Sequence, residues 1–425
     1  MHQLEDIKVA IIGLGYVGLP LAIAFGKKRT VLGFDIKEER ISQLRKAVDI
    51  QHEVHEEEFK QARYLSFTHD SGQLKDANCY IITVPTPIKK NNQPDLSPLI
   101  KASKLVGQYL KKNDIVIYES TVYPGATEEE CVPILEDTSG LQFNHDFFCG
   151  YSPERINPGD KNRKIENIKK ITSGSTPLIG KLIDSLYQEI IIAGTYLADS
   201  IKIAEAAKII ENTQRDINIA FINEITVFFN ELGIDTESVL QAAESKWNFH
   251  PYRPGLVGGH CIGVDPYYLS FKSQTVGHYP ELVNSARRIN ENMSRHIANQ
   301  MIRAMVQKKI SIAQSKILIL GFTFKENCTD IRNTQVAKLV EVLRSFDCYV
   351  DILDPWANNE EVGKEYGYSL INHPQSGDYD GLIIAVGHDQ FKQLDTQEML
   401  GWVKDPHIIY DLKHVLPRHI VDIRL

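Results

Sequence analysis

The sequence predicts an α/β fold in which two Rossmann-like, doubly wound parallel-sheet domains are joined by a long central helix and a helical middle domain. In the first and last parts of the chain, short apolar β-branched runs alternate with amphipathic stretches, a pattern typical of parallel sheets covered on both faces. Between them, from Asp199 to Leu232, apolar positions recur at helical spacing with no Gly or Pro. A chain of 425 residues is also too long for one ordinary core. We expect domains at 1–198, 199–309 and 310–425.

Each element follows from its local pattern. The apolar runs of the first domain predict strands at 8–15, 31–36, 79–87, 114–121 and 146–154. Gly233 supplies a stop signal for the long helix, and further helix follows to about residue 309, interrupted by a Gly/Pro-rich loop at 251–266. Apolar runs at 316–324, 349–355, 380–387 and 407–412 predict the second sheet, which has no G-x-G-x-x-G.

Composition and charge exclude several classes of protein. A net charge of −8 disfavours nucleic acid or an anionic membrane as a partner. The six cysteines form neither a C-x-x-C pair nor a zinc spacing, so we expect a reduced cytoplasmic protein without a metal site. Residues 9–26 are uncharged and long enough to span a bilayer, but they contain glycines and a proline and lack a basic start. We interpret them as a buried strand, a turn and a helix, and expect no membrane association.

The segment GLGYVG predicts a dinucleotide site. Gly13, Gly15 and Gly18 follow a strand and open a helix, where they permit a tight turn, close approach of a pyrophosphate and close helix packing. Asp35 ends the next strand, 22 positions after Gly13, where a carboxylate can accept hydrogen bonds from ribose hydroxyls. Because that carboxylate would repel the extra phosphate of NADP, we expect NAD as the cofactor.

Cys261, within GGHCIG, is either a compact buried residue or a nucleophile whose flanking glycines leave room for a substrate carbon. Lys208 and Asn212 share one face of the long helix, although both could be ordinary surface residues. Glu154 and Thr121 follow predicted strands, at the sheet edge where α/β folds bind ligands. Alternatively, Glu154 is an ordinary surface carboxylate, and Thr121 is there only for its strand and turn propensity.

An ordered set of motifs resembles one enzyme family. GLGYVGLP, VPTP, ESTVYPG, YSPERINPGD, RPGLVGGHC, VDPYYL and GFTFKENCTDIR occur in the order of the UDP-glucose/GDP-mannose dehydrogenase family, and the likeness covers essentially the whole chain. Within it, SPERINPGD and GGHC resemble the branch that oxidises UDP-N-acetylhexosamines, above all the UDP-N-acetylglucosamine 6-dehydrogenases of Vi-antigen and O-antigen type. Pro158 and Val264 stand where UDP-glucose enzymes usually have glutamate and lysine, which counts against UDP-glucose.

The resemblance implies an NAD-dependent four-electron oxidation of the sugar C6 hydroxyl to a carboxylate, in the supply of a capsule or O-antigen precursor. Cys261 would carry a thiohemiacetal and then a thioester. Lys208 and Asn212 would hold the developing oxyanion, and Asp265 would support proton removal in the first step. Glu154 would activate the hydrolytic water, with Thr121 ordering it.

The resemblance also implies binding residues and a homodimer paired through the central helices. The expected NAD contacts, besides the glycines and Asp35, are Tyr16, Val17, Arg40, Thr86, Thr121 and Arg332. The expected substrate contacts are Glu154, Arg155, Lys208, Asn212, Arg253, Gly258, Phe324, Lys325 and Lys413, with Arg253 reaching toward a neighbouring subunit. UDP-N-acetylgalactosamine and UDP-glucose stay open as substrates. A two-electron hydroxy-acid-type dehydrogenase and a non-enzymatic NAD-sensing or scaffold protein are more distant alternatives.

Overall fold

The computed structural model describes residues 2–51, 53–89, 91–155 and 164–425. Two compact units divide the chain: Met1–Glu211 with Tyr267–His278, and Asn212–Pro266 with Tyr279–Leu425. The predicted α/β fold class with two parallel sheets is confirmed, whereas the three domain boundaries stay a prediction. Pro158 lies outside the described residues.

The N-terminal unit is built on a six-stranded parallel sheet of order β3-β2-β1-β4-β5-β6. The order reverses between β1 and β4, which is the point where doubly wound folds bind dinucleotides. Its strands are β1 (Val9–Ile12), β2 (Val31–Phe34), β3 (Leu65–Thr68), β4 (Cys79–Ile82), β5 (Ile115–Tyr118) and β6 (Phe148–Tyr151). All pairs are parallel and in register, for example Val9 beside Val31 and Cys79.

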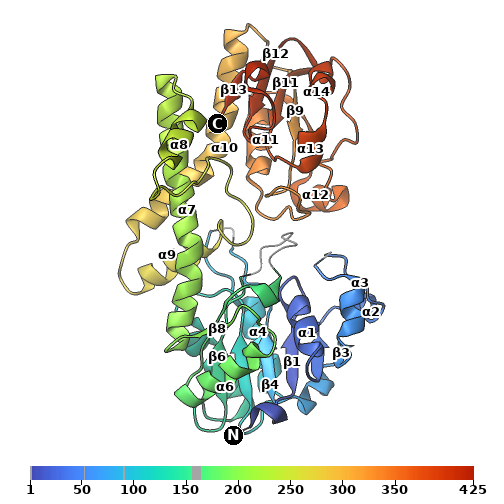
Figure 1. Ribbon diagram of the computed structural model, residues 1–425, viewed down its shortest axis with the longest axis vertical. Helices are drawn as coiled ribbons and strands as arrows, with labels where there is room; N and C mark the ends of the chain where they lie inside the picture. The colour runs from blue at the N-terminus through green and yellow to red at the C-terminus, as the bar shows by residue number, and fades with distance from the viewer. Residues whose placement is uncertain (1, 52, 90, 156–163) are drawn as a thin grey trace. The chain divides into compact units, whose positions relative to one another are not determined.

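Helices surround this sheet (Figure 1). They are α1 (Gly18–Gly26), α2 (Glu38–Arg45), α3 (Glu56–Gln61), α4 (Ser97–Gly107), α5 (Val132–Ser139) and α6 (Pro177–Gln188). Apolar side chains of α1, α2 and α6 join those of the strands in one core, because both faces of a parallel sheet must be covered. A separate parallel pair, β7 (Lys170–Thr172) and β8 (Thr195–Leu197), lies before the long helix.

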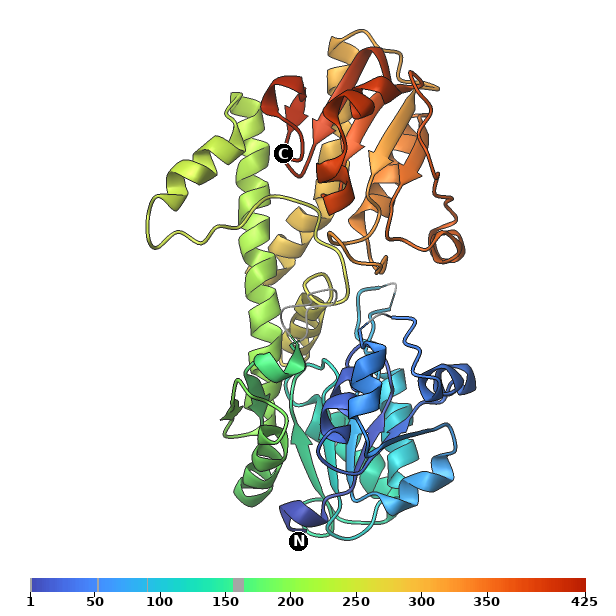
Figure 2. The same ribbon diagram turned by 45° about the vertical axis from the view of Figure 1, so that its right-hand side comes forward.

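The middle of the chain is helical. The helices are α7 (Ile201–Leu232), α8 (Thr236–Glu244), α9 (Asp265–Thr275) and α10 (Glu281–Gln307). Gly233 follows α7 with φ +68°, a left-handed conformation that favours glycine and ends the helix where the sequence predicts. Figure 2 shows α7 as one uninterrupted rod.

The C-terminal unit holds a five-stranded parallel sheet of order β10-β9-β11-β12-β13. Its strands are β9 (Lys316–Leu320), β10 (Tyr349–Leu353), β11 (Tyr379–Ile384), β12 (Val403–Asp411) and β13 (Ile423–Arg424). The helices beside it are α11 (Gln335–Ser345), α12 (Asn359–Tyr366), α13 (Asp389–Gln393) and α14 (Thr396–Trp402). Helix α10 packs against α11 and β12 and contributes Met293, Ile297 and Met301 to the core.

Candidate active site

The glycine loop has the geometry of a dinucleotide cradle. Gly13 has φ +96°, and a Cβ at Gly18 would overlap the carbonyl oxygen of Gly13, so both positions require glycine. At Gly15, in contrast, a Cβ would meet no atom within 4 Å, which leaves open space beside the backbone. Tyr16 and Val17 complete the half-buried turn before α1. A pyrophosphate fits this combination of free space and helix N-terminus.

Asp35 is held at the end of β2 by the same loop. Its Oδ2 accepts a hydrogen bond from the backbone N–H of Leu14 at 2.9 Å, and its Oδ1 accepts one from Lys37 at 3.0 Å. Arg40 donates from Nε and Nη2 to the carbonyl oxygen of Leu14 at 3.1 and 3.0 Å, and its Nη1 pairs with Asp49 at 2.9 Å. In this structure Arg40 therefore braces the glycine loop, and its direct contact with NAD stays a prediction.

Thr86 and Thr121 lie on loops that follow β4 and β5, and both are half-buried. The hydroxyl of Tyr268 donates to the carbonyl oxygen of Thr86 at 2.9 Å, which anchors that loop. Glu205 of α7 anchors the loop after β5, because its carboxylate accepts from the backbone N–H groups of Gly125 at 2.5 Å and Thr127 at 2.9 Å. Burial raises the pKa of Glu205 to about 7.

Glu154 is buried and belongs to a charged cluster that the sequence did not reveal. Its Oε2 lies 3.5 Å from the Nζ of Lys170, which also lies 2.9 Å from the Oε2 of Glu119. The hydroxyl of Tyr187 donates to Glu119. Burial of Lys170 opposes its charge, but the two carboxylates outweigh burial and raise the pKa of Lys170 above its ordinary value. Burial raises the pKa of Glu119 despite the ammonium beside it.

Arg155, expected to contact substrate, forms an ion pair with Glu211 of α7 and donates from Nη2 to the carbonyl oxygen of Ala207 at 3.0 Å. It thus ties the segment after β6 to α7. Both arginine contacts fall on the turn of α7 that carries Lys208.

The buried face of α7 is polar over much of its length. Lys208 is 6% exposed and Asn212 1% exposed, so neither is the ordinary surface residue that the sequence left as an alternative. The amide of Asn212 donates to Oδ2 of Asp265, the first residue of α9, and Arg215 donates to Oδ1 of Asn212. The structure therefore joins two of the predicted catalytic residues, Asn212 and Asp265, directly.

Cys261 lies in the turn that precedes α9. It is half-buried, whereas the other five cysteines are buried, and all six are free thiols. The carbonyl oxygen of Cys261 accepts from the backbone N–H of Asp265 at 2.8 Å, which fixes the thiol one turn before that carboxylate.

The glycines beside Cys261 serve a purpose different from the one expected. A Cβ at Gly258 would lie 2.7 Å from the carbonyl oxygen of Asn333, and a Cβ at Gly259 would lie 2.8 Å from the ring of Phe324. Gly259 also has φ +79°. The expectation that these glycines leave free space is wrong, because they let the loop pack closely on the segment after β9.

Three predicted substrate contacts line one small pocket of the C-terminal unit: Gly258, Phe324 and Lys413. Its remaining lining has Thr323, Thr334 and Gln335 as polar groups beside Leu256, Val336, Ala385 and Val386. The ammonium of Lys413 pairs with Glu326 at 3.3 Å. In this structure the cavity is no larger than a water molecule, and its lining is as polar as it is apolar.

The other predicted contacts of this unit do not line the pocket. Lys325 is half-buried. Arg253 pairs with Glu244 and, through Nε, with Glu237 at 2.8 Å. Arg332 pairs with Asp330, with Nη2 2.6 Å from Oδ2. Their assignments to substrate and to NAD stay predictions.

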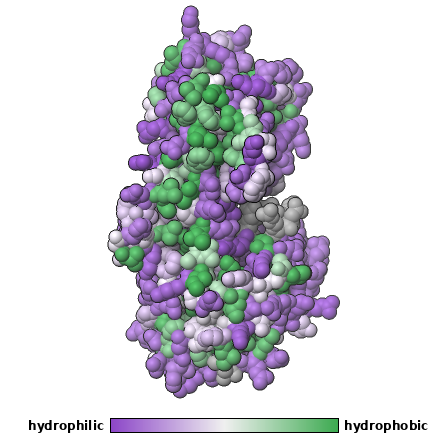
Figure 3. Space-filling model, turned by 60° about the vertical axis from the view of Figure 1, so that its left-hand side comes forward, coloured by the Kyte–Doolittle hydropathy of each residue, from purple (hydrophilic) through white to green (hydrophobic). Residues whose placement is uncertain are grey.

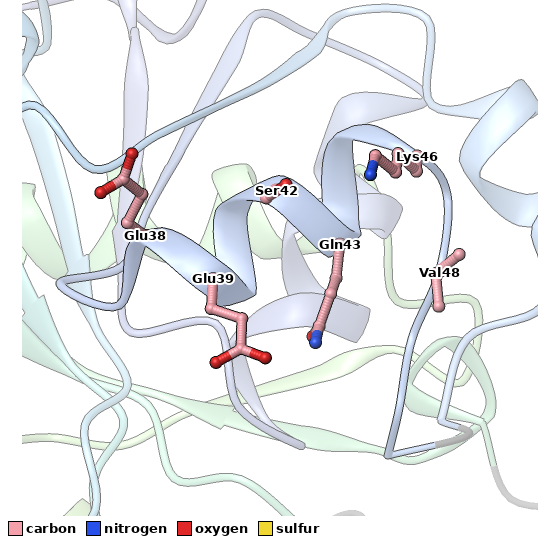
Figure 4. A pocket seen from close by; sticks show the side chains of 6 residues that line it. All are labelled: Glu38, Glu39, Ser42, Gln43, Lys46 and Val48. Carbon is pink, nitrogen blue, oxygen red and sulfur yellow. The ribbon is translucent and has the colours of Figure 1, made fainter.

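A second depression lies over α2, between Glu38 and Val48 (Figure 4). Figure 4 shows Glu39 and Gln43 pointing to the same side of the helix. The depression is lined mainly by exposed side chains of a single helix. None of the predicted site residues lines it.

The described part of the chain contains no helix that is long and apolar enough to cross a membrane. Among the same residues, no group of three or more His, Cys, Asp or Glu side chains could hold a metal ion.

Sequence reasoning missed Lys170, Glu119, Arg215 and Asp330. Glu119 had a usable signal, since an acid that directly follows the buried run Ile115–Tyr118 requires a buried cation. Lys170 had none, because it is one of two adjacent lysines, and only packing shows that it is 3% exposed.

Comparisons with known proteins agree over the whole chain. Models of the UDP-glucose/GDP-mannose dehydrogenase family match in three parts: its NAD binding domain at residues 7–191, its central domain at 202–292 and its UDP binding domain at 318–418. A UDP-N-acetyl-D-glucosamine 6-dehydrogenase of Salmonella typhi is 60% identical over 100% of both chains. One of Pseudomonas aeruginosa is 56% identical over 99% of this chain and 100% of the relative. The solved UDP-D-ManNAc dehydrogenase of Pyrococcus horikoshii is 30% identical and covers 98% of each chain, with a TM-score of 0.88.

Proposed function

The chain belongs to the UDP-glucose/GDP-mannose dehydrogenase family, and we propose that within it the protein is an NAD-dependent UDP-N-acetyl-D-glucosamine 6-dehydrogenase. The full-length likeness to two enzymes of that name supports the substrate. The observation that carries the proposed chemistry is Cys261, the one partly exposed thiol of six, fixed one turn before Asp265. The product, a UDP-linked uronic acid, would serve as a precursor of a surface polysaccharide.

The first oxidation requires a proton to leave the C6 hydroxyl. NAD would supply the hydride acceptor, one molecule for each of the two oxidations. Asp265 supports removal of the proton, and its carboxylate is held by the hydrogen bond that it accepts from the amide of Asn212. Lys208 provides a buried cation that stabilises negative charge on the substrate oxygen.

The second oxidation requires a covalent adduct, because an aldehyde has no hydride to release until a nucleophile adds to it. The sulfur of Cys261 adds to C6 and forms a thiohemiacetal, whose oxidation gives a thioester. The oxyanion of the adduct is stabilised by Lys208 and by the amide of Asn212.

Hydrolysis of the thioester requires an activated water. Glu154 removes a proton from the water as it attacks the acyl carbon, and the sulfur of Cys261 leaves as the thiolate. Thr121 helps to order the water. The ammonium of Lys170 lies 3.5 Å from Oε2 of Glu154 and holds the carboxylate in place.

Phe324 and Lys413, which line the small pocket of the C-terminal unit, would contact the nucleotide part of the substrate. The match of residues 318–418 to a UDP binding domain supports this assignment.

Product stoichiometry tests the proposed function. Purified protein is supplied with UDP-N-acetylglucosamine, UDP-N-acetylgalactosamine or UDP-glucose, and NADH and sugar are quantified together. We expect two NADH for each UDP-N-acetylglucosamine consumed and slower turnover of the other two sugars. A ratio of one would show a two-electron dehydrogenase instead. If none of the three sugars were oxidised, the proposed enzymatic activity would be excluded.

We also propose a homodimer that pairs through α7. Phe221, Phe228 and Leu232 are 56%, 58% and 56% exposed, and their spacing places them on one face of the helix. Ile203 and Ile210, seven residues apart, are also largely exposed at its start. Figure 3 shows hydrophobic side chains gathered on the face of the molecule that carries α7. A stripe of this kind is typical of a protein–protein interface.

Sedimentation tests the dimer. The double substitution Phe221→Glu and Phe228→Glu would place charges in the interface, so we expect a monomer. Ile192→Glu is the matched control, since Ile192 is 81% exposed but lies outside α7. A dimer that persists in the double variant would place the interface on another surface.

A reducing cytoplasm is the proposed location of the protein, because it keeps the thiol of Cys261 available.

A further inference from the structure

His260, the residue immediately before Cys261, has no role in the chemistry described above. Its Nδ1 lies 3.2 Å from Oδ2 of Asp330, and each of the two side chains is 13% exposed. The ring of His260 meets the ring of Phe324 edge to face, with centroids 6.2 Å apart. The imidazole is therefore held between a carboxylate and an aromatic ring, next to the thiol.

Asp330 is anchored in turn by Arg332. The Nε of Arg332 donates to Oδ1 of Asp330 at 2.9 Å, and its Nη2 donates to Oδ2 at 2.6 Å. Burial opposes ionisation of this carboxyl, but the hydrogen bonds from His260 and Arg332 outweigh burial and hold its pKa well below the usual range. Asp330 therefore carries a fixed negative charge beside the imidazole.

A fixed carboxylate favours the charged form of histidine. Burial of His260 disfavours the imidazolium, but the negative charges of Asp330 and of Cys261 outweigh burial and raise the pKa of His260 to about 9. Arg332, whose Nη2 lies 3.2 Å from the same Nδ1, acts in the opposite direction. In the imidazolium, Nδ1 carries a proton and donates to Asp330, so Arg332 is directed to the carboxylate rather than to the ring.

A cation beside a cysteine stabilises the thiolate, which is the nucleophilic form of the side chain. We propose that the imidazolium of His260, anchored by Asp330, holds the sulfur of Cys261 as a thiolate at neutral pH. His260 is a positioning residue, because it acts on the substrate only through the sulfur. The inference rests on the proposed nucleophilic role of Cys261 and adds the group that activates it.

This arrangement also explains why the thiol needs no separate general base. When the sulfur is already a thiolate, addition to the C6 aldehyde forms the carbon–sulfur bond without a proton transfer from the thiol. After hydrolysis of the thioester the sulfur leaves as the same thiolate, and the imidazolium again balances its charge. No proton enters or leaves His260 during the cycle.

The test measures the thiol rather than turnover. The full-length protein is treated with iodoacetamide from pH 5 to 9.5, and alkylation of each cysteine is followed by peptide mass spectrometry. The five buried cysteines are internal controls, since they should react slowly at every pH. A free cysteine thiol has a pKa of about 8.5. We expect the alkylation rate at Cys261 in the unmodified protein to reach half its maximum well below that pH.

Two variants isolate the imidazolium. His260→Gln should move the midpoint of the Cys261 profile to about pH 8.5 or above and reduce alkylation at pH 7 roughly tenfold or more. Asp330→Asn keeps the imidazole but removes its fixed counter-charge, so it should move the midpoint in the same direction by less. The Asp330→Asn variant also tests the inference by itself if His260→Gln does not fold. His278→Gln, at an exposed histidine, is the matched control and should leave the profile unchanged.

The outcomes separate this inference from the proposed function. If both variants fold and keep the midpoint of the unmodified protein, His260 only packs the loop and the inference is wrong. A midpoint at or above pH 8.5 in the unmodified protein would also overturn it. A shifted midpoint together with no oxidation of any nucleotide sugar would support the thiolate and exclude the enzyme.

Discussion

The ammonium of Lys170 lies between two buried carboxylates, 2.9 Å from Oε2 of Glu119 and 3.5 Å from Oε2 of Glu154. The side chains of Lys170 and Glu119 are 4% and 0% exposed, so water screens this cluster little. Glu154 is 9% exposed and marks the edge of the cluster toward solvent. One buried cation therefore serves both a structural acid and the proposed base.

Replacing Lys170 should damage stability and chemistry together. Lys170→Met leaves two buried carboxylates without their cation, so we expect a loss of roughly 3–5 kcal/mol in the free energy of unfolding. Because the ammonium also holds the carboxylate of Glu154 in place, kcat at pH 7 should fall while KM for the sugar changes little. Chemical denaturation and steady-state kinetics measure the two effects.

Lys170→Arg is the control, because it keeps the charge at the same position. It should retain more activity and more stability than Lys170→Met. If Lys170→Met keeps normal kcat across the pH range, the lysine supports only the fold and not Glu154.

Glu154→Gln should separate formation of the thioester from its hydrolysis. The amide cannot accept a proton from water, and loss of a positioned base typically slows its step about 10²–10⁴-fold. A burst of NADH should therefore precede slow turnover, and intact-protein mass spectrometry should show an added UDP-sugar acyl mass. The mass should be absent when Cys261→Ser is combined with Glu154→Gln. With neither burst nor adduct, Glu154 would act in an earlier step or only in the fold.

Asp35→Ala should weaken NAD binding and reduce the preference over NADP. The carboxylate of Asp35 is already oriented by the backbone N–H groups of Leu14 and Lys37, and we expect it to accept hydrogen bonds from the ribose hydroxyls. Asp35→Asn is the matched control, since it keeps an acceptor and removes the charge that repels the extra phosphate. Dissociation constants for both cofactors provide the measurement. Equal use of NAD and NADP by the unmodified protein would contradict the assignment.

The stability of the C-terminal unit should depend on pH through His260. Its folded-state pKa, about 9, is raised above the ordinary histidine value of 6.5. The stabilisation from its ion pair with Asp330 is therefore complete below pH 6.5 and is lost as the pH rises through about 9. We expect the difference in Tm between the unmodified protein and His260→Gln to be largest near pH 6 and small at pH 9.5. A difference that is constant with pH would mean that the two proteins differ only in packing.

Most of the fold could be predicted because its signals are local. Fully buried parallel strands such as Val9–Ile12 are continuous apolar runs, and a 32-residue helix shows its period many times before Gly233 ends it. The strand β3 was missed, because it lies at the sheet edge and only one of its four residues is buried. The strands β7 and β8 have three residues each, too few to show a period.

For the site, the sequence by itself determined those features that depend only on residues close together in the chain. The turn at Gly13, the open position at Gly15 and the close packing at Gly18 follow from spacing, as do Lys208 and Asn212 on one helix face. Only the tertiary structure decided how charges pair over long distances in the chain. His260 meets Asp330 across 70 positions, and Lys170 meets Glu119 across 51. No periodicity records such pairs, because the free energy of a buried charge depends on what the fold brings beside it, and not on its neighbours in the sequence.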